Sequence, residues 1–316
     1  MKIALLGNNE VDYCSEVHYQ KTLQSMGHEV FFITERRSNT EDILKIALQC
    51  DMFVWIHSHG FENPGTLTMR EVLAELKEAG VPSVAYHLDL YMGLERWKEY
   101  QTHEYFDVEY FFTVDKLMAD WLNENTKTKA FFLEAGVFDQ ECVMLPKQPV
   151  RYDTIFAGAK NYHKEWPYRP KLVQWLEDNL GKRFIHIGGD GAGVFRGLAL
   201  NQIYANAKVV VGDSLNPDFN YPYYSSDRFF ETMGRGGFLI YPKIEGFAPD
   251  YVDGVHVVYY KHGDLEDLRA KLQYYLNHDD EREQIRINGF TLTKEKNTYK
   301  NRWQSILDTV FGEQDA

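Results

Sequence analysis

Residues 225–242, SSDRFFETMGRGGFLIYP, bring hydroxyls, a cation and a carboxylate together in one short segment. Ser225 or Ser226 is expected to cap the start of a helix, where free backbone N–H groups and the positive end of the helix dipole gather. Arg228 falls in the first turn, where a cation costs roughly a few tenths of a kcal/mol. Because an anion in front of the helix would offset this repulsion, the pattern indicates a site for a charged ligand.

Glu231 follows Arg228 about one helical turn later, and two partners for its carboxylate are open. One is Arg235, four positions on, in a surface ion pair of the kind that helices often carry. The other is a ligand, since a carboxylate accepts hydrogen bonds from two hydroxyl groups of a sugar. The glycines that follow end the helix and let the chain return to a strand.

Three cations surround a single loop in AGAKNYHKEWPYRP, residues 157–170. Lys160 and Lys164 follow an expected strand, and Arg169 lies where the next helix is expected to begin. In a chain of net charge −13, this concentration of positive charge indicates an anion site. The alternative is a charged loop that is simply solvated.

A glycine-rich loop, HIGGDGAG at 186–193, also follows an expected strand. Such a loop alone is weak support for ligand binding, because glycine also serves merely to turn a chain. Its position raises its value, since open α/β sheets bind ligands beyond the carboxyl ends of their strands. Gly188 and Gly189 are therefore candidates for contact with a ligand.

Two polar clusters end strands in the first half of the chain. In IHSHG, His57 and His59 are two apart on an extended segment, so they point to opposite sides and are poorly placed to share a metal. His57 is expected to be structural, and His59 is the candidate for a ligand contact. In YHLDLY, His87 and Asp89 share a face and form a candidate acid–base or substrate-orienting pair. The alternative is a polar pair that satisfies the loop backbone.

These loops belong to a chain in which apolar strands alternate with amphipathic helices. Strands such as KIALLG (2–7) are almost continuously apolar, which is typical of a parallel sheet covered on both faces. The alternation pauses at a segment with two prolines, residues 144–153, and then restarts. The sequence thus predicts an α/β fold of two Rossmann-like doubly wound domains, 1–148 and 149–297, that face each other across a cleft.

Composition narrows the classes of function. The chain has 316 residues, 44% of them hydrophobic, and its net charge of −13 disfavours nucleic-acid binding, which needs a basic surface. Three widely spaced cysteines, Cys14, Cys50 and Cys142, predict reduced thiols in a cytoplasmic protein. The first residues lead directly into a strand without a signal peptide, and no run reaches about 18 apolar residues, so no membrane span is expected.

Five sets of segments, taken in order, resemble GT-B glycosyltransferases, most closely their CgeB-like, spore-maturation branch. They are VPSVAYHLDLY, YFFTVDKLMADWL with FFLEAGVFDQE, DTIFAGAKNYHKEWPYRPKLVQWL, ALNQIYANAKVVVGDS and SSDRFFETMGRGGFLIYP. The resemblance covers most of the chain and is best from about residue 82 onward. It implies a GT-B fold whose last helix, within 298–316, packs back on the first domain.

The resemblance implies that the second domain binds a nucleotide-diphosphate sugar, such as a UDP-sugar, as co-substrate, with no other cofactor and no bound metal. Glu231 matches the glutamate that holds the ribose, and Arg228 with the serine-capped helix would face the diphosphate. Arg169 or Lys160 would form a second clamp on the anion. Tyr223 stands where the wider family often has a further glutamate.

The function implied is transfer of the sugar to an unknown acceptor on the side of the first domain, a glycan, protein or small molecule rather than DNA. Asp89 or His59 would act as base in an inverting enzyme or orient the acceptor in a retaining one. Two alternatives stay open. One is a non-catalytic module that binds the nucleotide sugar, and the other is a phage-type DNA-base glycosyltransferase on the same fold.

Overall fold

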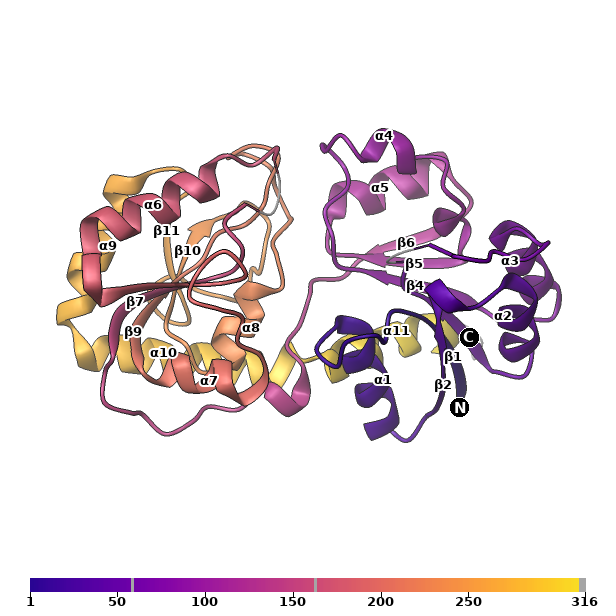
Figure 1. The fold of residues 1–316 in the computed structure, drawn as a ribbon, viewed down its shortest axis with the longest axis horizontal. Coiled ribbons are helices and arrows are strands. Elements are labelled where there is room, and N and C mark those ends of the chain that lie inside the picture. The colour runs from indigo at the N-terminus through magenta and orange to yellow at the C-terminus, as the bar shows by residue number, and fades with distance from the viewer. Residues whose placement is uncertain (58–59, 162–163, 313–316) are drawn as a thin grey trace. The chain divides into compact units, whose positions relative to one another are not determined.

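The computed structural model of the chain describes residues 1–57, 60–161 and 164–312. These residues form two compact units: unit 1 comprises residues 1–134 and the last helix, and unit 2 comprises residues 135–298. In the described ranges each unit holds a parallel β-sheet with helices packed against it (Figure 1). The predicted fold class of two doubly wound α/β domains is confirmed.

The proline-containing segment after residue 143 belongs to unit 2 rather than lying between the units. Its backbone is bonded to that unit, since the N–H groups of Gln148 and Arg151 donate to the carbonyl oxygens of Ala205 and Asn206. The units therefore divide after Glu134, earlier than the boundary the prolines indicated.

Unit 1 is built on a sheet whose described strands run in the order β2-β1-β3-β4-β5-β6, all parallel. The four inner strands are almost wholly buried, because their residues are apolar on both faces of the sheet. The strands are β1 (Lys2–Gly7), β2 (Glu29–Thr34), β3 (Met52–Trp55), β4 (Ser83–His87), β5 (Tyr110–Thr113) and β6 (Lys129–Phe132).

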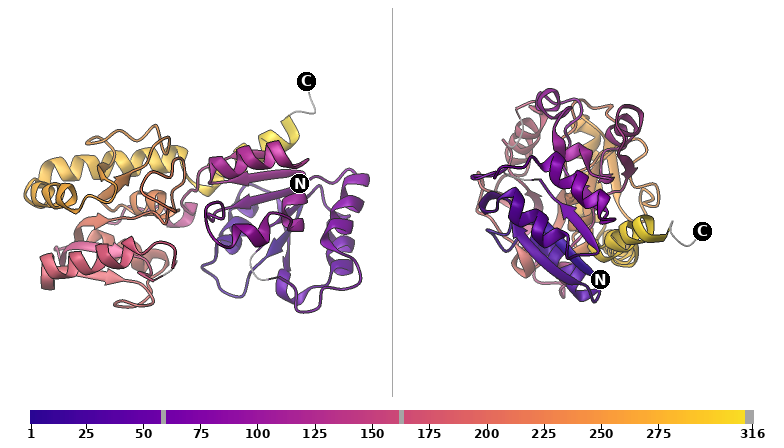
Figure 2. Two further views of the ribbon diagram at one scale, coloured as in Figure 1. Left: turned by 90° about the horizontal axis from the view of Figure 1, so that it is seen from above. Right: turned by 90° about the vertical axis from the view of Figure 1, so that its right-hand side faces the viewer.

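Helices cover both faces of this sheet. On one face Ile43 of α2 packs in the same apolar cluster as Ala85 of β4. The next residue, Tyr86, points to the opposite face and contacts Trp303 of α11, which also contacts Tyr19 of α1 with ring centroids 5.4 Å apart. Figure 2 shows α11 lying along unit 1. The helices are α1 (Ser15–Ser25), α2 (Thr40–Ala47), α3 (Met69–Glu78), α4 (Trp97–Tyr100), α5 (Lys116–Asn125) and α11 (Tyr299–Phe311).

Local sequence explains where these helices begin and end. Thr68 and Glu71 form a reciprocal capping box at the start of α3, and the Asn39 side chain caps α2. The chain leaves α1 and α3 at Gly27 and Gly80, whose φ angles of +90° and +74° are in the left-handed region that favours glycine. A glycine just after the last turn is the usual sequence signal for the end of a helix.

Unit 2 has parallel strands in the order β11-β10-β9-β7-β8 within its described residues. They are β7 (Tyr152–Ala157), β8 (Phe184–Ile187), β9 (Ala207–Val211), β10 (Leu239–Lys243) and β11 (Val258–Lys261). The helices are α6 (Tyr168–Leu180), α7 (Gly197–Ala205), α8 (Arg228–Gly234), α9 (Leu265–Asn277) and α10 (Asp279–Lys296). Single 3-10 turns occur in both units at Glu35–Arg37, Glu104–Asp107, Asp139–Glu141 and Gly181–Arg183.

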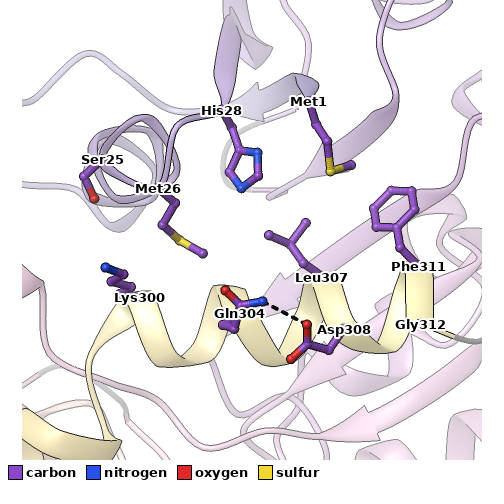
Figure 3. A pocket seen from close by; sticks show the side chains of 10 residues that line it. All are labelled: Met1, Ser25, Met26, His28, Lys300, Gln304, Leu307, Asp308, Phe311 and Gly312. Atoms are coloured by element: carbon purple, nitrogen blue, oxygen red, sulfur yellow. Dashed lines mark hydrogen bonds between the residues drawn. The ribbon is translucent and has the colours of Figure 1, made fainter.

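A groove of about 720 Å³ lies at the amino-terminal ends of β1 and β2 in unit 1 (Figure 3). His28 reaches into it beside Met26 and Leu307, and burial lowers the pKa of this histidine. Because ligands of such sheets bind at the opposite, carboxyl edge, the groove is separate from the candidate site. Over the described parts of the chain, no helix combines the length and apolarity needed to cross a bilayer.

Candidate functional site

The loops after β7 and β8 meet through glycine backbones. Gly158, directly after β7, donates its N–H to the carbonyl oxygen of Ile187, 2.7 Å away. A Cβ added at Gly188 would lie 2.6 Å from the carbonyl oxygen of Gly158, so no side chain fits there. Gly189 is exposed, with open space where a side chain would be. The carboxyl ends of two adjacent strands thus form one surface of bare backbone, called the glycine surface below.

Asp190 ties the loop after β7 to this surface. Its carboxylate accepts the backbone N–H groups of Lys160 and Asn161 at 3.1 and 3.2 Å. Partial burial raises the pKa of this carboxyl, but the N–H donors outweigh that effect and the net pKa is lowered. The structure therefore brings predicted residues Lys160, Gly188 and Gly189 together, and it leaves the Lys160 side chain partly exposed.

Arg228, the first residue of α8, lies with its guanidinium against Gly158. A Cβ built at Gly158 would lie 3.2 Å from Nε of Arg228, and the φ of +148° at this glycine is rare for other residues. Burial lowers the pKa of Arg228, but the carboxylates of Glu231 and Asp227 outweigh it and the net pKa is raised. A permanently charged guanidinium therefore stands beside the glycine surface.

Glu231 lies one turn beyond Arg228 in α8. Its Oε1 is 3.6 Å from Nη2 of Arg235, so the predicted i,i+4 pair is present. The expected surface character of that pair is wrong, because Arg235 is only 3% exposed and also pairs with Glu141. The Glu231 side chain itself is 22% exposed. Its carboxylate thus has a buried cation on one side and access to solvent on another.

The predicted serine cap of this helix is absent. Asp227 occupies the cap position with helical backbone angles, and no side chain caps the helix. Ser225 is buried instead, with its Oγ 2.6 Å from Oη of Tyr241 in β10. Ser226 contributes its carbonyl oxygen, which accepts the N–H of Phe229. Ser226 and Ser225 lie one and two residues before the cap position, and neither side chain caps the helix.

Arg169 is buried at the start of α6, where it binds the protein itself. Its Nε is 3.0 Å from Oδ2 of Asp213, and Nη2 donates to the Asp213 carbonyl oxygen at 3.1 Å. Nη1 donates to the carbonyl oxygen of Ala159 at 3.3 Å, and Trp166 also donates to Asp213. Arg169 thus holds the loop after β7 through the Ala159 carbonyl. These contacts differ from those expected of a cation that meets a ligand directly.

In unit 1, Asp89 follows β4 and is exposed, whereas His87 at the end of the strand is buried. Burial lowers the pKa of His87 to about 4, although Asp89 acts in the opposite direction. Among the described residues, Nε2 of His87 has no hydrogen-bond partner. The two side chains therefore differ in their access to solvent, and Asp89 is the exposed one of the pair.

His57 and His59 follow β3. His59 lies outside the described residues. Nδ1 of His57 is 2.6 Å from Oε1 of Glu35, a buried carboxylate that also accepts from Nε1 of Trp55 at 2.8 Å. The ring of His57 stacks on His103 with centroids 4.7 Å apart. His57 is therefore part of a packed polar cluster at this end of the sheet.

Burial of a neutral His87 predicts acid sensitivity. The unfolded chain takes up a proton at this histidine below about pH 6.5, whereas the folded protein resists protonation until its pKa of about 4. The stability gained from keeping His87 neutral is therefore fully present above the pKa of the unfolded chain. It is lost as the pH falls toward 4, by about 3 kcal/mol at most. Urea unfolding across this range should show a smaller loss for His87→Phe than for the wild type.

Exposed His278 supplies the control for that measurement. His278→Gln should lose stability with falling pH as steeply as the wild type. Equal slopes for His87→Phe and the wild type would contradict the assignment.

Three residues that shape the site are absent from the predicted set: Gly158, Asp190 and Asp213. Gly158 and Asp190 lie within the two loops that the sequence singled out, and a glycine directly after a strand was the available signal for close backbone approach. Asp213 follows β9 after one glycine, so its position at the carboxyl end of a strand was a similar signal.

Comparison with solved structures identifies the fold. Solved structures of GT-B glycosyltransferases match nearly the whole chain, so the fold is GT-B. An alpha-glucosyltransferase in complex with UDP-glucose and DNA containing an abasic site matches with a TM-score of 0.70 at 10% identity, over 98% of this chain and 99% of that one. A glycosyltransferase from Rickettsia africae ESF-5 matches with a TM-score of 0.66 at 12% identity, over 98% of both chains.

HepE from Anabaena, solved with UDP and glucose, matches with a TM-score of 0.64 at 11% identity, over 98% of this chain and 99% of that one. At the level of sequence, residues 169–308 match the model of a family described as glycosyl transferase-like. No curated protein matches the sequence. The matched range begins at Arg169 and includes all of α8, which carries Arg228 and Glu231.

Proposed function

We propose that the protein is a glycosyltransferase that takes a sugar from a UDP-sugar bound by unit 2. The observation that carries the proposal is the placement of α8, which sets Arg228 against the glycine surface with Glu231 one turn away. The family match over this helix supports it, as do the uridine nucleotides named in the complexes of the structural neighbours. The ordered motifs favour the CgeB-like branch of these enzymes.

In this proposal the donor diphosphate lies on the glycine surface beside Arg228 and Lys160. Fixed cations and backbone N–H groups would then stabilise the charge on the departing nucleoside diphosphate, without a metal ion. Glu231 would accept hydrogen bonds from the two ribose hydroxyls. Arg169 would act indirectly, because it donates a hydrogen bond to the Ala159 carbonyl and so fixes the loop that carries Lys160.

The acceptor is proposed to meet unit 1 at the carboxyl end of β4, where Asp89 is exposed. Asp89, or His59, would take the proton of the acceptor hydroxyl in an inverting reaction or orient that hydroxyl in a retaining one. We favour a glycan, protein or small-molecule acceptor over DNA because the chain carries a net charge of −13. DNA is the second candidate, because one structural neighbour was solved with DNA.

Incubation of the wild type with a panel of UDP-, GDP- and TDP-sugars should release the nucleoside diphosphate from a UDP-sugar in particular. Binding of UDP-glucose without turnover would instead favour a non-catalytic module. Failure to bind or turn over any donor would count against the proposal. A gel-shift with plain and modified duplex DNA at stated salt separates the DNA acceptor from the others, since salt screens phosphate contacts.

Glu231→Gln should weaken UDP-glucose binding roughly 10- to 100-fold, because a charged acceptor of hydrogen bonds is worth about 1.5–3 kcal/mol. Isothermal calorimetry measures the affinity. Glu266→Gln is the matched control, since Glu266 forms an exposed i,i+3 pair with Arg269 in the same unit. Unchanged affinity in Glu231→Gln would remove Glu231 from the donor site.

A further inference from the structure

Arg235, directly after α8, joins three segments of unit 2 through its guanidinium. Nη2 pairs with Oε2 of Glu141, which lies 94 positions earlier in the chain. Nη1 donates to Oδ1 of Asn201 at 2.9 Å and to the carbonyl oxygen of Gly197 at 3.1 Å. The same Nη2 lies 3.6 Å from Oε1 of Glu231. Two carboxylates from distant parts of the sequence therefore share one nitrogen of a buried cation.

Glu141 is held firmly at this place. Asn201, which is fully buried, donates from Nδ2 to the carbonyl oxygens of Glu141 and Val143 at 2.9 and 2.8 Å. The Glu141 side chain is 13% exposed. Since its backbone is anchored by Asn201, Glu141 holds the guanidinium from a segment outside α8.

The positive charge of Arg235 allows Glu141 and Glu231 to stay ionised close to each other. Burial lowers the pKa of Arg235, but Glu231 and Glu141 outweigh it and the net pKa is raised. Without the cation, two carboxylates would face each other in partly buried surroundings, where like charges drive one of them to take up a proton. The titratable groups that face this cluster within the described residues are Glu141, Cys142, Tyr204, Asp227, Arg228 and Glu231.

We propose that Arg235 is a positioning residue for the donor site, which keeps the Glu231 carboxylate charged and holds it in the orientation that meets the donor ribose. This inference rests on the proposed function, since it takes Glu231 as the ribose ligand. A flexible surface partner could not do this, because such pairs exchange readily with solvent. Arg235 is fixed by three other contacts, so the carboxylate it holds is fixed as well.

The test measures UDP-glucose affinity by calorimetry from about pH 5 to about pH 8, a range that includes the raised pKa expected for a carboxyl beside a second carboxylate. UDP-glucose is the probe because its diphosphate is substituted at both ends and takes up no further proton in this range. The wild type should show a flat profile. Arg235→Gln should bind about tenfold more weakly at neutral pH, and progressively more weakly as pH falls and Glu231 becomes protonated.

A second substitution separates positioning from general structural support. Adding Glu141→Gln to the Arg235→Gln variant removes the repelling carboxylate, so it should flatten the pH profile, while the affinity stays below that of the wild type because Glu231 still lacks the cation that orients it. Arg286→Gln is the control, because Arg286 is also a partly buried arginine paired with a glutamate, Glu283, and it donates to the nearby Gly236 carbonyl. It should lower thermal stability without changing donor affinity.

Wild-type affinity and a flat profile in Arg235→Gln would overturn the inference and leave the proposed function intact. Failure of the wild type to bind any nucleotide sugar would overturn the proposed function itself. Should Arg235→Gln not fold, Arg235→Lys keeps the charge but loses the planar fork. It should bind UDP-glucose several-fold more weakly with a flat profile, and wild-type affinity in that variant would equally contradict the inference.

Discussion

Arg228→Gln should lower kcat/KM for the sugar donor roughly 10²- to 10³-fold, because it removes a preorganised charge from the place proposed for the diphosphate, which gains negative charge as it leaves. Arg228→Lys should recover only part of the loss, since an ammonium lacks the planar fork that suits phosphate oxygens. Initial rates of nucleoside diphosphate release measure both effects. Should the wild type bind donor without turnover, the same variants are compared by UDP-glucose affinity.

Arg183→Gln is the matched control for Arg228. Arg183 is an exposed arginine of the same unit, paired with Asp153 on the surface. Its loss should leave the rate within a factor of about two, because exposed ion pairs contribute little to stability. A rate for Arg228→Gln equal to that of this control would exclude Arg228 from the donor site.

Asp213→Ala should destabilise the protein by about 3–5 kcal/mol, the usual consequence of leaving a buried charge without its partner. Asp213 is 2% exposed and receives Nε of Arg169 at 3.0 Å and Nε1 of Trp166 at 2.9 Å. Its removal would strand the Arg169 guanidinium in the apolar interior. Urea unfolding followed by circular dichroism gives the change in the free energy of unfolding.

Two further variants make this stability prediction specific. Asp153→Asn breaks a more exposed pair with Arg183 and should leave the free energy of unfolding nearly unchanged. Adding Arg169→Met to Asp213→Ala should recover much of the loss, because an apolar side chain needs no partner. No recovery in the double variant would show that Asp213 acts through contacts other than the ion pair.

The alternation of strands and helices could be predicted because it depends on patterns of neighbouring residues. Continuous apolar runs gave the buried strands, and Gly27 and Gly80 marked helix ends that require a positive φ. Helix α10 cannot be recognised from an apolar pattern, because its buried face consists of Arg282, Ile285, Gly289 and Thr293. A stripe with only one apolar side chain in four produces no hydrophobic periodicity, although the spacing is helical.

The site was predictable only where its contacts are local. Glu231 and Arg235 are four apart, so their pairing followed from helix geometry. The partners that define their surroundings come from far away, since Glu141 is 94 positions from Arg235 and Asp213 is 44 from Arg169. Such pairs depend on how strands are ordered in the sheet, and residue spacing carries no record of that order.

The serine cap shows a different limit. Serine before a helix is a strong local preference, but Ser225 is drawn instead to the hydroxyl of Tyr241 in β10. A tertiary hydrogen bond in the interior replaced the local one, and the helix begins at Arg228 without a side-chain cap. Arg228 in this segment still lies against the glycine surface. The helix was therefore predicted correctly, but the way it is capped was not.

The position of α11 has a consequence for how the chain folds during synthesis. Unit 1 is made first, but Tyr19 and Tyr86 stay uncovered until Trp303 emerges to pack on them. At about 5–20 residues per second, translation of the whole of unit 2 intervenes and takes on the order of 10 to 30 s. The nascent chain must therefore carry an open apolar face through that interval, and the unit that begins folding first is the last to be completed.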